Sequence, residues 1–407
     1  MKFSLNGTEL REAKIIIPGS KSESNRLLIL SSLYKNLSLE NLSNSDDTNY
    51  LFDALSKKKK IINIGHAGTA MRFLTSLLAL KTETEIELRG SNRMHHRPIK
   101  ILVESLKKIG ASIQYLDKSG FPPLLIKTSK LKGKKLSIES SISSQYISSL
   151  LLIAPRIEEG LEIELLGRET SLSYINMTLN LLKKIGVNIK SENNIIKVKE
   201  LKKINPLKIS IESDWSSASY YYSVVAMANI GYSLTLSSYR KDSIQGDSKV
   251  SEIYKSFGVK TVYKSDSIIL KKVRKNITNI SLDLSSSPDL AQTICVTCLG
   301  LKMKCTLFGL HTLKIKETDR LAALKNELSK FNLKVYISTD SISFSDTSDL
   351  KPGIEIKTYD DHRMAMSFAC LAVKTNITIC NPSVVTKSYN SFWSDFKKIG
   401  IISNKYQ

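Results

Sequence analysis

Apolar and polar positions follow one recurring pattern along this chain: an amphipathic stretch ends in a small residue, and a short apolar stretch follows. The segments that show it most clearly are "SLKKIGASIQYL", "LLKKIGVNIKS", "IYKSFGVKTVY", "LSKFNLKVYIS" and "DFKKIGIIS". Their turn residues are Gly110, Gly186, Gly258, Asn332 and Gly400, separated by 76, 72, 74 and 68 positions. Gly and Asn readily take the left-handed conformation that ends a helix, so each segment predicts a helix, a turn and a strand. With a weaker first copy, "LFDALSKKKKIINI", six repeats of roughly 70 residues fit the chain.

Each repeat also contains a second, more apolar segment that begins with small or polar residues. The six are "KSESNRLLIL", "AGTAMRFLTSLL", "SSQYISSLLLIA", "WSSASYYYSVVAMA", "SSPDLAQTICVTCLG" and "DDHRMAMSFACLAV". Helices that are apolar on nearly every side are buried, so these segments predict core helices. The Ser, Thr and Asp residues at their starts are typical N-caps.

Capping does not explain the cations near these helix starts, which are Lys21, Arg26, Arg72 and Arg363. The helix dipole is already positive there, so a cation is unfavourable without a negative partner. Violations of local preference are expected at functional sites. Free backbone N–H groups at helix starts also bind anions. The pattern therefore predicts that several helix starts together bind acidic ligands.

The length of 407 residues predicts two domains, because a single hydrophobic core rarely grows so large. Three repeats in each domain is the simplest α/β arrangement. We expect an inserted domain at residues 21–212 and a discontinuous domain made of residues 1–20 and 213–407. The buried helices of both would point their N-termini at a shared interdomain cleft.

The net charge of +22 indicates partners that are anionic, either nucleic acid or small polyanions. No zinc-finger spacing, aromatic RNA-binding motif or basic low-complexity tail favours nucleic acid. The N-terminus has no apolar signal-peptide region, and no apolar run reaches the roughly 18 residues of a membrane helix. We therefore expect a cytoplasmic protein with neither a membrane nor a nucleic-acid partner.

The five cysteines all lie in the C-terminal third: Cys295, Cys298, Cys305, Cys370 and Cys380. An odd number in apolar surroundings argues against a disulfide framework. "CVTC" has the spacing of a metal-binding pair, but no second pair or His cluster completes four ligands. The pattern favours buried thiols over a metal or redox site.

Seven motifs, "PGSKSESNR", "AGTAMR", "RPI", "SSQ", "KETDR", "DDHRMAM" and "VVTKSYNSFW", occur in this order over almost the whole chain. Together they resemble the EPSP synthase (3-phosphoshikimate 1-carboxyvinyltransferase) family. The resemblance implies the two-domain enolpyruvyl transferase fold, an α/β fold in which each domain consists of three βαβαββ units. It also implies transfer of the enolpyruvyl group of phosphoenolpyruvate to the 5-hydroxyl of shikimate 3-phosphate by addition and elimination, in the shikimate pathway of aromatic amino-acid biosynthesis. No metal or other cofactor is implied, and we expect a monomer.

The resemblance assigns one set of residues to shikimate 3-phosphate: Lys21, Ser22, Arg26, Ser143, Ser144, Gln145, Ser171, Tyr174, Asp289, Thr312 and Lys316. It assigns an overlapping set to phosphoenolpyruvate: Lys21, Gly68, Arg97, Gln145, Arg320, Arg363 and Lys387. Arginine suits phosphate and carboxylate groups because it binds them in bidentate pairs that lysine cannot copy. Glycine suits a position where a side chain would collide with a ligand.

The catalytic residues that the resemblance implies are Asp289, Glu317 and Lys21. The 5-hydroxyl must lose a proton while the vinyl carbon of phosphoenolpyruvate gains one, so two positioned proton-transfer groups are needed. We assign Asp289 as the base toward the hydroxyl, and Glu317 with Lys21 to proton delivery. A nearby carboxylate would also stabilise the positive charge that develops beside the protonated carbon.

The chain departs from the family pattern at three positions. His66 stands where Asn usually precedes "AGT", Phe73 follows "AMR" where proline is frequent, and Thr312 replaces a common Asn. Phe73 is expected to alter how Gly68 and Thr69 are presented. Because no charged catalytic group is lost, and Gly68 leaves room beside phosphoenolpyruvate, we expect inhibition by glyphosate.

Several residues have a purely structural alternative. Asp361 is an N-cap or a charge near the substrate, and His362 is a structural histidine or a proton-transfer group; we favour the structural role for His362. Asp46 and Asp47 are caps of a helix or groups of the active site, and Ser148 taken alone is more simply a capping residue.

Two functional alternatives stay open from the sequence. UDP-N-acetylglucosamine enolpyruvyl transferase shares the fold and phosphoenolpyruvate, but typically has a loop cysteine and an early "KN" motif. Here the first motif is "KSESNR", and no cysteine precedes Cys295. A basic repeat protein that binds RNA would also explain the charge, but not the paired carboxylates among the repeated helix starts.

Overall fold

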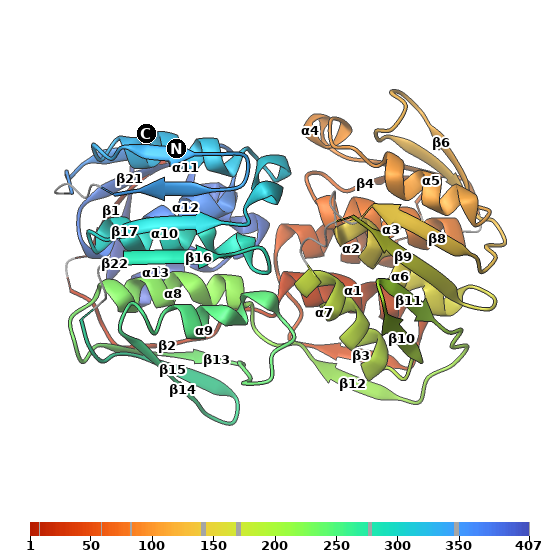
Figure 1. Ribbon diagram of the computed structural model, residues 1–407, viewed down its shortest axis with the longest axis horizontal. Coiled ribbons are helices and arrows are strands. Elements are labelled where there is room, and N and C mark those ends of the chain that lie inside the picture. The colour runs from red at the N-terminus through yellow and green to blue at the C-terminus, as the bar shows by residue number, and fades with distance from the viewer. Residues whose placement is uncertain are drawn as a thin grey trace. The chain divides into compact units, whose positions relative to one another are not determined.

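The computed structural model describes residues 1–7, 9–57, 59–81, 84–139, 144–167, 172–275, 279–345 and 350–406. The chain forms two compact units (Figure 1). The discontinuous unit comprises Met1–Pro18 and Glu212–Gln407, and the inserted unit comprises Gly19–Ile211. The chain therefore leaves the first unit after its N-terminal segment and returns to it once the inserted unit is complete.

The inserted unit contains ten strands and seven α-helices among its described residues, with one short 3-10 helix. In chain order they are α1 (Lys21–Leu33), β3 (Leu37–Glu40), α2 (Asp46–Ser56), β4 (Ile61–Asn63), α3 (Gly68–Leu80), β5 (Ile86–Arg89), α4 (Asn92–His95), α5 (Lys100–Lys108), β6 (Ser112–Tyr115), β7 (Leu124–Lys127), β8 (Lys135–Glu139), α6 (Ser144–Ile153), η1 (Ala154–Arg156), β9 (Leu161–Leu166), α7 (Leu172–Lys184), β10 (Ile189–Glu192), β11 (Ile195–Val198) and β12 (Leu207–Ser210).

The discontinuous unit has the same alternation of strands and helices. Its elements are β1 (Lys2–Gly7), β2 (Lys14–Ile15), α8 (Trp215–Met227), β13 (Ser233–Ser237), η2 (Gly246–Lys249), α9 (Val250–Ile253), β14 (Val259–Tyr263), β15 (Ser267–Lys272), β16 (Asn279–Asp283), η3 (Pro288–Leu290), α10 (Ala291–Gly300), β17 (Lys304–Phe308), η4 (His311–Ile315), α11 (Arg320–Ser329), β18 (Val335–Ile337), β19 (Ile342–Phe344), β20 (Ile354–Ile356), α12 (His362–Ala369), η5 (Cys370–Val373), β21 (Ile377–Cys380), η6 (Pro382–Lys387), α13 (Phe392–Lys398) and β22 (Ile401–Tyr406).

Five four-stranded sheets share one strand order among the described residues. In each, a parallel pair is extended by two antiparallel strands, as in β4-β5-β7-β6, β10-β11-β9-β8 and β16-β17-β19-β18. Parallel neighbours require a crossover, and the apolar helix of each repeat supplies it. The repeats that the sequence predicts are therefore βαβαββ units.

Three sheets join strands that are not consecutive in the chain. In one of them β2 pairs with β13, on the far side of the inserted unit in sequence. Strand β1 completes the last sheet by pairing with β21 and β22, so the first strand of the chain lies between two of its last. The sixth sheet contains only the parallel pair β3 and β12, in which Leu37 lies opposite Leu207. This pair thus joins a strand near the start of the inserted unit to a strand near its end.

The predicted turn residues have the expected backbone conformation. Their φ angles are positive: 107° at Gly110, 96° at Gly186, 75° at Gly258, 60° at Asn332 and 89° at Gly400. This confirms the interpretation of these residues as helix-ending turns.

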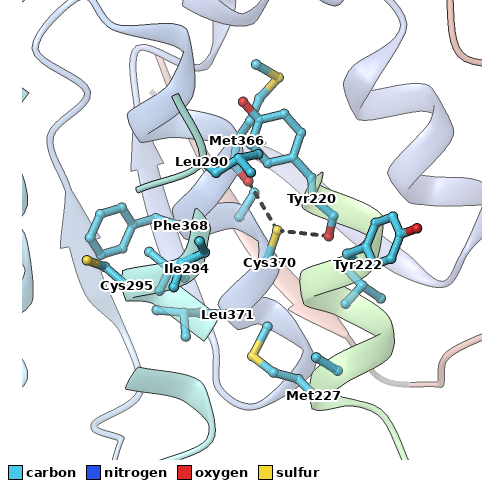
Figure 2. Packing of buried hydrophobic residues seen from close by; sticks show 14 of the residues in the cluster. Tyr220, Tyr222, Met227, Leu290, Ile294, Cys295, Met366, Phe368, Cys370 and Leu371 are labelled. Atoms are coloured by element: carbon cyan, nitrogen blue, oxygen red, sulfur yellow. Dashed lines mark hydrogen bonds between the residues drawn. The ribbon is translucent and has the colours of Figure 1, made fainter. Parts of the chain in front are cut away.

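The second, apolar helix of each repeat is buried, as predicted. In the discontinuous unit α10 packs against both α8 and α12. Ser219, Thr293 and Ser367, each 74 residues from the next, come from the three helices. The Thr293 hydroxyl lies 3.2 Å from that of Ser219 and 3.1 Å from that of Ser367. Figure 2 shows the apolar packing nearby, where the Cys370 thiol donates to the carbonyls of Tyr220 and Met366, 3.4 Å away.

The cysteines are free thiols, and Cys295, Cys298, Cys305 and Cys370 are buried. Burial in this core raises the pKa of Cys370 well above its ordinary value. Within the described ranges, no helix has the length and apolarity needed to span a bilayer.

Candidate active site

In the inserted unit, the cation at the start of α1 has a negative partner on another helix. Ser20 caps α1 by accepting from the backbone N–H of Glu23 at 3.4 Å, and Lys21 is the first helical residue. Its Nζ lies 3.2 Å from Oδ2 of Asp47, in the first turn of α2. Ser45 caps α2, so Asp47 is available to offset the charge of Lys21.

Arg26, one turn further along α1, is buried among neutral oxygens. Nε donates to Oγ1 of Thr178 at 2.7 Å, and Nη2 donates to Oγ of Ser148 at 3.1 Å and to the Tyr174 carbonyl at 3.2 Å. Nη1 donates to the Ser22 carbonyl at 2.9 Å. Burial lowers the pKa of Arg26 to about 10, which still leaves it charged at neutral pH. The hydrogen-bond partners of Arg26 are neutral, and the charge of Glu23 offsets its burial only in part, so an anion would be favoured beside it.

Two aromatic rings lie close to the same guanidinium. The Arg26 guanidinium carbon is 5.5 Å from the ring centroid of Phe73 and 5.8 Å from that of Tyr174. Cation–π contacts of this kind help to fix the orientation of the cation.

The start of α3 is occupied by two further arginines. A Cβ atom at Gly68 would overlap Nη1 of Arg97, so the absence of a side chain makes room for this guanidinium. Buried Arg72 donates to the carbonyl of Gly68 at 3.1 Å and to that of Pro98 at 3.0 Å, which connects the start of α3 to the backbone just after Arg97. Burial, followed by repulsion from Arg97, lowers the pKa of Arg72 to about 10.

The start of α6 adjoins that of α3. The side-chain amide of Gln145 donates to Oγ1 of Thr69 at 3.4 Å, and Ser144, the first residue of α6, is buried. Two further predicted residues of this set, Ser143 and Ser171, lie outside the described residues.

In the discontinuous unit, Arg320 binds three carboxylates at once. Asp319 caps α11, and Arg320 is its first residue. Nε of Arg320 lies 2.7 Å from Asp361, Nη1 lies 2.8 Å from Asp289, and Nη2 lies 2.8 Å from Glu317. Burial alone would lower the pKa of Arg320, but the three carboxylates, Asp361 first, raise it above its ordinary value.

Asp289 bridges Arg320 to a second arginine. Its Oδ2 lies 3.1 Å from Nη2 of Arg363, the second residue of α12, and Nζ of Lys316 lies 3.6 Å from its Oδ1. Asp361 caps α12 by accepting from the Arg363 backbone N–H at 2.8 Å. Asp361 is therefore an N-cap, and its charge also pairs with Arg320.

Glu317 is held between two cations. One oxygen contacts Arg320, and the other lies 3.1 Å from Nζ of Lys387. The sequence-predicted residues of this unit, from η3, the 316–320 segment, α12 and η6, thus form one alternating cluster of positive and negative groups.

Comparisons with known proteins show which family this chain resembles. The family model for EPSP synthase (3-phosphoshikimate 1-carboxyvinyltransferase) matches residues 53–396. The chain is 40% identical over 404 residues to the 3-phosphoshikimate 1-carboxyvinyltransferase of Bacteroides fragilis strain YCH46, with 98% of each chain covered. The chain belongs to the EPSP synthase family.

Other relatives extend the likeness. The 3-phosphoshikimate 1-carboxyvinyltransferase of Buchnera aphidicola subsp. Cinara cedri is 38% identical over 434 residues, covering 99% of this chain and 98% of the relative. The solved EPSP synthase of Acinetobacter baumannii has a TM-score of 0.81 at 21% identity and covers 99% of this chain and all of that one. The two-domain α/β fold implied by the resemblance is thereby confirmed.

Sequence reasoning missed several polar partners of the family's residues. Ser148 lies inside α6 and accepts from Arg26, so its interpretation as a capping residue is wrong. Thr178 contacts Arg26 across 152 positions of sequence. The predictions depended on charged residues near the starts of the repeated helices. Ser148 and Thr178 are uncharged, so no feature of the sequence indicated their contacts with Arg26.

Asp247 was also missed. It accepts from Oγ of Ser216, which in turn accepts from Nη2 of Arg363 at 3.2 Å. Burial, followed by the negative charge of Asp289, raises the pKa of Asp247 to about 6. Asp247 lies in η2, within "SIQGDSK", which contains no helix-start cation.

The departures from the family pattern have local explanations. Nδ1 of His66 lies 2.8 Å from Oγ of Ser91, whereas Phe73 packs on Arg26 as described above. Thr312 is buried, and its Oγ1 has no hydrogen-bond partner within the described part of the chain. His362 is buried in α12, with its Nδ1 3.8 Å from Oδ1 of Asp361.

Proposed function

We propose that this chain transfers the enolpyruvyl group of phosphoenolpyruvate to the 5-hydroxyl of shikimate 3-phosphate, giving EPSP and inorganic phosphate. The observation that carries the proposal is the cluster in which Arg320 and Arg363 hold Asp289 between them, while Arg320 also holds Glu317. Membership of the EPSP synthase family supports the same reaction.

The inserted unit supplies cations suited to shikimate 3-phosphate. Lys21 and Arg26 lie on one helix, and Arg26 has neutral partners in Ser148, Thr178 and Tyr174. A phosphate oxyanion would give Arg26 the negative partner that these groups do not provide. We assign Ser22, Ser144 and Gln145 to the same substrate, together with Ser143 and Ser171.

Phosphoenolpyruvate carries a carboxylate and a phosphate, and both suit bidentate guanidinium groups. We assign Arg97 above Gly68, with Lys21, Gln145, Arg320, Arg363 and Lys387, to this substrate. Arg320 and Arg363 are already oriented by carboxylates, so little side-chain entropy would be lost when an anion binds.

The buried hydroxyl groups near Asp289 support a ligand beside it. Thr312 on η4 and Ser287 before η3 have hydroxyl oxygens that are buried without a hydrogen-bond partner in the described ranges, and η3 contacts η4. Buried polar atoms are nearly always paired in native proteins, so a polar ligand is expected to pair with them. We assign Asp289, Thr312 and Lys316 to the shikimate 3-phosphate hydroxyl groups.

The reaction needs two coupled proton transfers. Asp289 takes the proton of the 5-hydroxyl group while the hydroxyl oxygen attacks C2 of phosphoenolpyruvate. Glu317 with Lys21 delivers a proton to C3, which becomes a methyl group. In the second step C3 loses a proton, the C2–O bond to phosphate breaks, and the vinyl group re-forms. Fixed charges around the reacting carbon stabilise its developing positive charge without reorganisation.

A phosphate-release assay with both substrates tests this function. We expect release with shikimate 3-phosphate and none when a UDP-sugar replaces it; the opposite result would indicate the UDP-N-acetylglucosamine transferase activity. Lys21→Met should lower kcat at least about 100-fold, because it removes a proton-transfer group. Lys35→Met is the matched control, since Lys35 is exposed just beyond α1, and equal activity of the two variants would contradict the assignment of Lys21.

The proposal also covers the oligomeric state and the cellular location of the protein. We propose a monomer that acts in the cytoplasm on small-molecule substrates. Size-exclusion chromatography with light scattering measures the first property directly.

A further inference from the structure

A buried carboxylate on α11 lies outside every assignment made above. Glu327 is fully buried, two turns after Arg320 on the same helix. Residues seven apart lie on one face of a helix, so Glu327 and Arg320 point toward the same neighbour. Oε1 of Glu327 accepts from the phenol of Tyr359 at 2.7 Å. Oε2 accepts from the backbone N–H of Lys357 at 3.0 Å and from Nζ of Lys330 at 2.6 Å.

The neighbour that Glu327 holds is the turn before α12. Tyr359 and Asp360 both have φ of 54°, a left-handed conformation that is unfavourable for residues other than glycine. Oδ1 of Asp360 accepts from the side-chain amide of Asn381 at 3.1 Å, and the Asp361 N–H donates to the Thr358 carbonyl at 2.9 Å. Strained turns of this kind persist only where surrounding contacts fix them, and they concentrate at functional sites.

The turn and α11 are therefore joined at two places. One is the ion pair between Arg320 and Asp361, in which the charged groups belong to the proposed site. The other is Glu327, which accepts from the Tyr359 hydroxyl and from the Lys357 N–H and touches no proposed ligand. Arg320 has two further carboxylate partners, so it would stay buried and paired if Asp361 moved. The second attachment keeps Asp361 in place.

On the basis of the proposed function, we infer that Glu327 and Tyr359 form a positioning pair for the reaction. They hold the 357–361 turn in the conformation in which Asp361 meets Arg320 and caps the helix that carries Arg363. Burial, followed by the hydrogen bond to Glu327, raises the pKa of Tyr359 to about 12, so the phenol remains a donor at neutral pH. Lys330 neutralises Glu327, and the Tyr359 hydroxyl supplies the connection to the turn.

Tyr359→Phe tests the inference because it deletes one hydroxyl while Glu327 keeps its two other donors. We expect kcat/KM for phosphoenolpyruvate to fall about tenfold, since small displacements of substrate-orienting groups have effects of this size or larger. The thermal midpoint should fall by only a few degrees. Tyr336→Phe is the matched control, because Tyr336 is 63% exposed on β18 of the same unit, and its kinetics should equal those of the unmodified chain.

A double-mutant cycle separates positioning from general stability. If Tyr359 acts through Asp361, Tyr359→Phe should lower kcat/KM by less than about twofold further in an Asp361→Asn background. Full additivity of the two effects, or activity of Tyr359→Phe within twofold of the control, would overturn the inference.

Amide exchange measured on the same variants does not depend on activity. Peptides covering residues 357–366 should exchange faster in Tyr359→Phe than in Tyr336→Phe, because the turn loses one of the two hydrogen bonds that attach it to Glu327. Equal exchange would overturn the positioning role. If the unmodified chain releases no phosphate, the proposed function fails, and these exchange rates still decide the positioning pair.

Discussion

At the scale of single residues, cations at helix starts are stabilised in two ways. Lys21 and Arg320 lie against carboxylates, whereas Arg26 and Arg72 have neutral oxygens as partners. The cations could be predicted because a positive charge against the helix dipole is visible in the sequence itself. Their partners could not, since a neutral residue such as Thr178, far along the chain, carries no comparable signal.

Gly68→Ala gives a residue-scale prediction. The new Cβ would overlap the Arg97 guanidinium, and because this is the end of a flexible side chain, Arg97 should move while the fold stays intact. We expect the KM for phosphoenolpyruvate and the inhibition constant of glyphosate to rise together, by about tenfold. Steady-state kinetics measure both constants.

The control for this prediction is the same change in an Arg97→Ala background. If Gly68 acts by making room for Arg97, Gly68→Ala should have little further effect there. A rise in KM of equal size in both backgrounds would contradict the placement of Arg97 over Gly68.

At the scale of elements, the repeated pattern predicted the buried helices and their turns because both depend on local residue spacing. The pattern could not predict which strands close each sheet. Strand β1 lies between β21 and β22, and β3 pairs with β12, and both arrangements join segments from distant parts of the sequence. Short apolar strands carry too little information to specify such partners.

The turn that ends α13 gives an element-scale prediction. Gly400 has φ of 89°, and a Cβ there would overlap the backbone carbonyl of Glu9, which cannot move aside as a side chain can. Gly400→Ala should therefore lower the free energy of unfolding by more than the roughly 1–2 kcal/mol expected from the left-handed conformation alone. Thermal denaturation measures the difference.

Gly353→Ala is the matched control in the same unit. Gly353 has φ of 76°, and a Cβ there would meet nothing within 4 Å among the described residues, so only the conformational penalty applies. Equal losses of stability in the two variants would show that the Gly400 turn does not pack on Glu9 as described.

At the scale of the whole molecule, the fold class and family followed from motifs that extend over almost the entire chain. The lysine-rich composition gave less information. Many lysines form exposed pairs, such as Lys197 with Glu162 and Lys208 with Glu40, and such pairs contribute little to stability. The net charge of +22 fits two anionic substrates but does not by itself identify them.

Mass spectrometry of the product formed in deuterium oxide tests the central claim most directly. Addition converts the vinyl carbon of phosphoenolpyruvate into a methyl group that contains one solvent-derived hydrogen, and elimination then removes one of its three. The account predicts EPSP in an amount equal to the phosphate released, with deuterium in its vinyl group. Phosphate release without EPSP, or EPSP that carries no deuterium, would contradict enolpyruvyl transfer by addition and elimination.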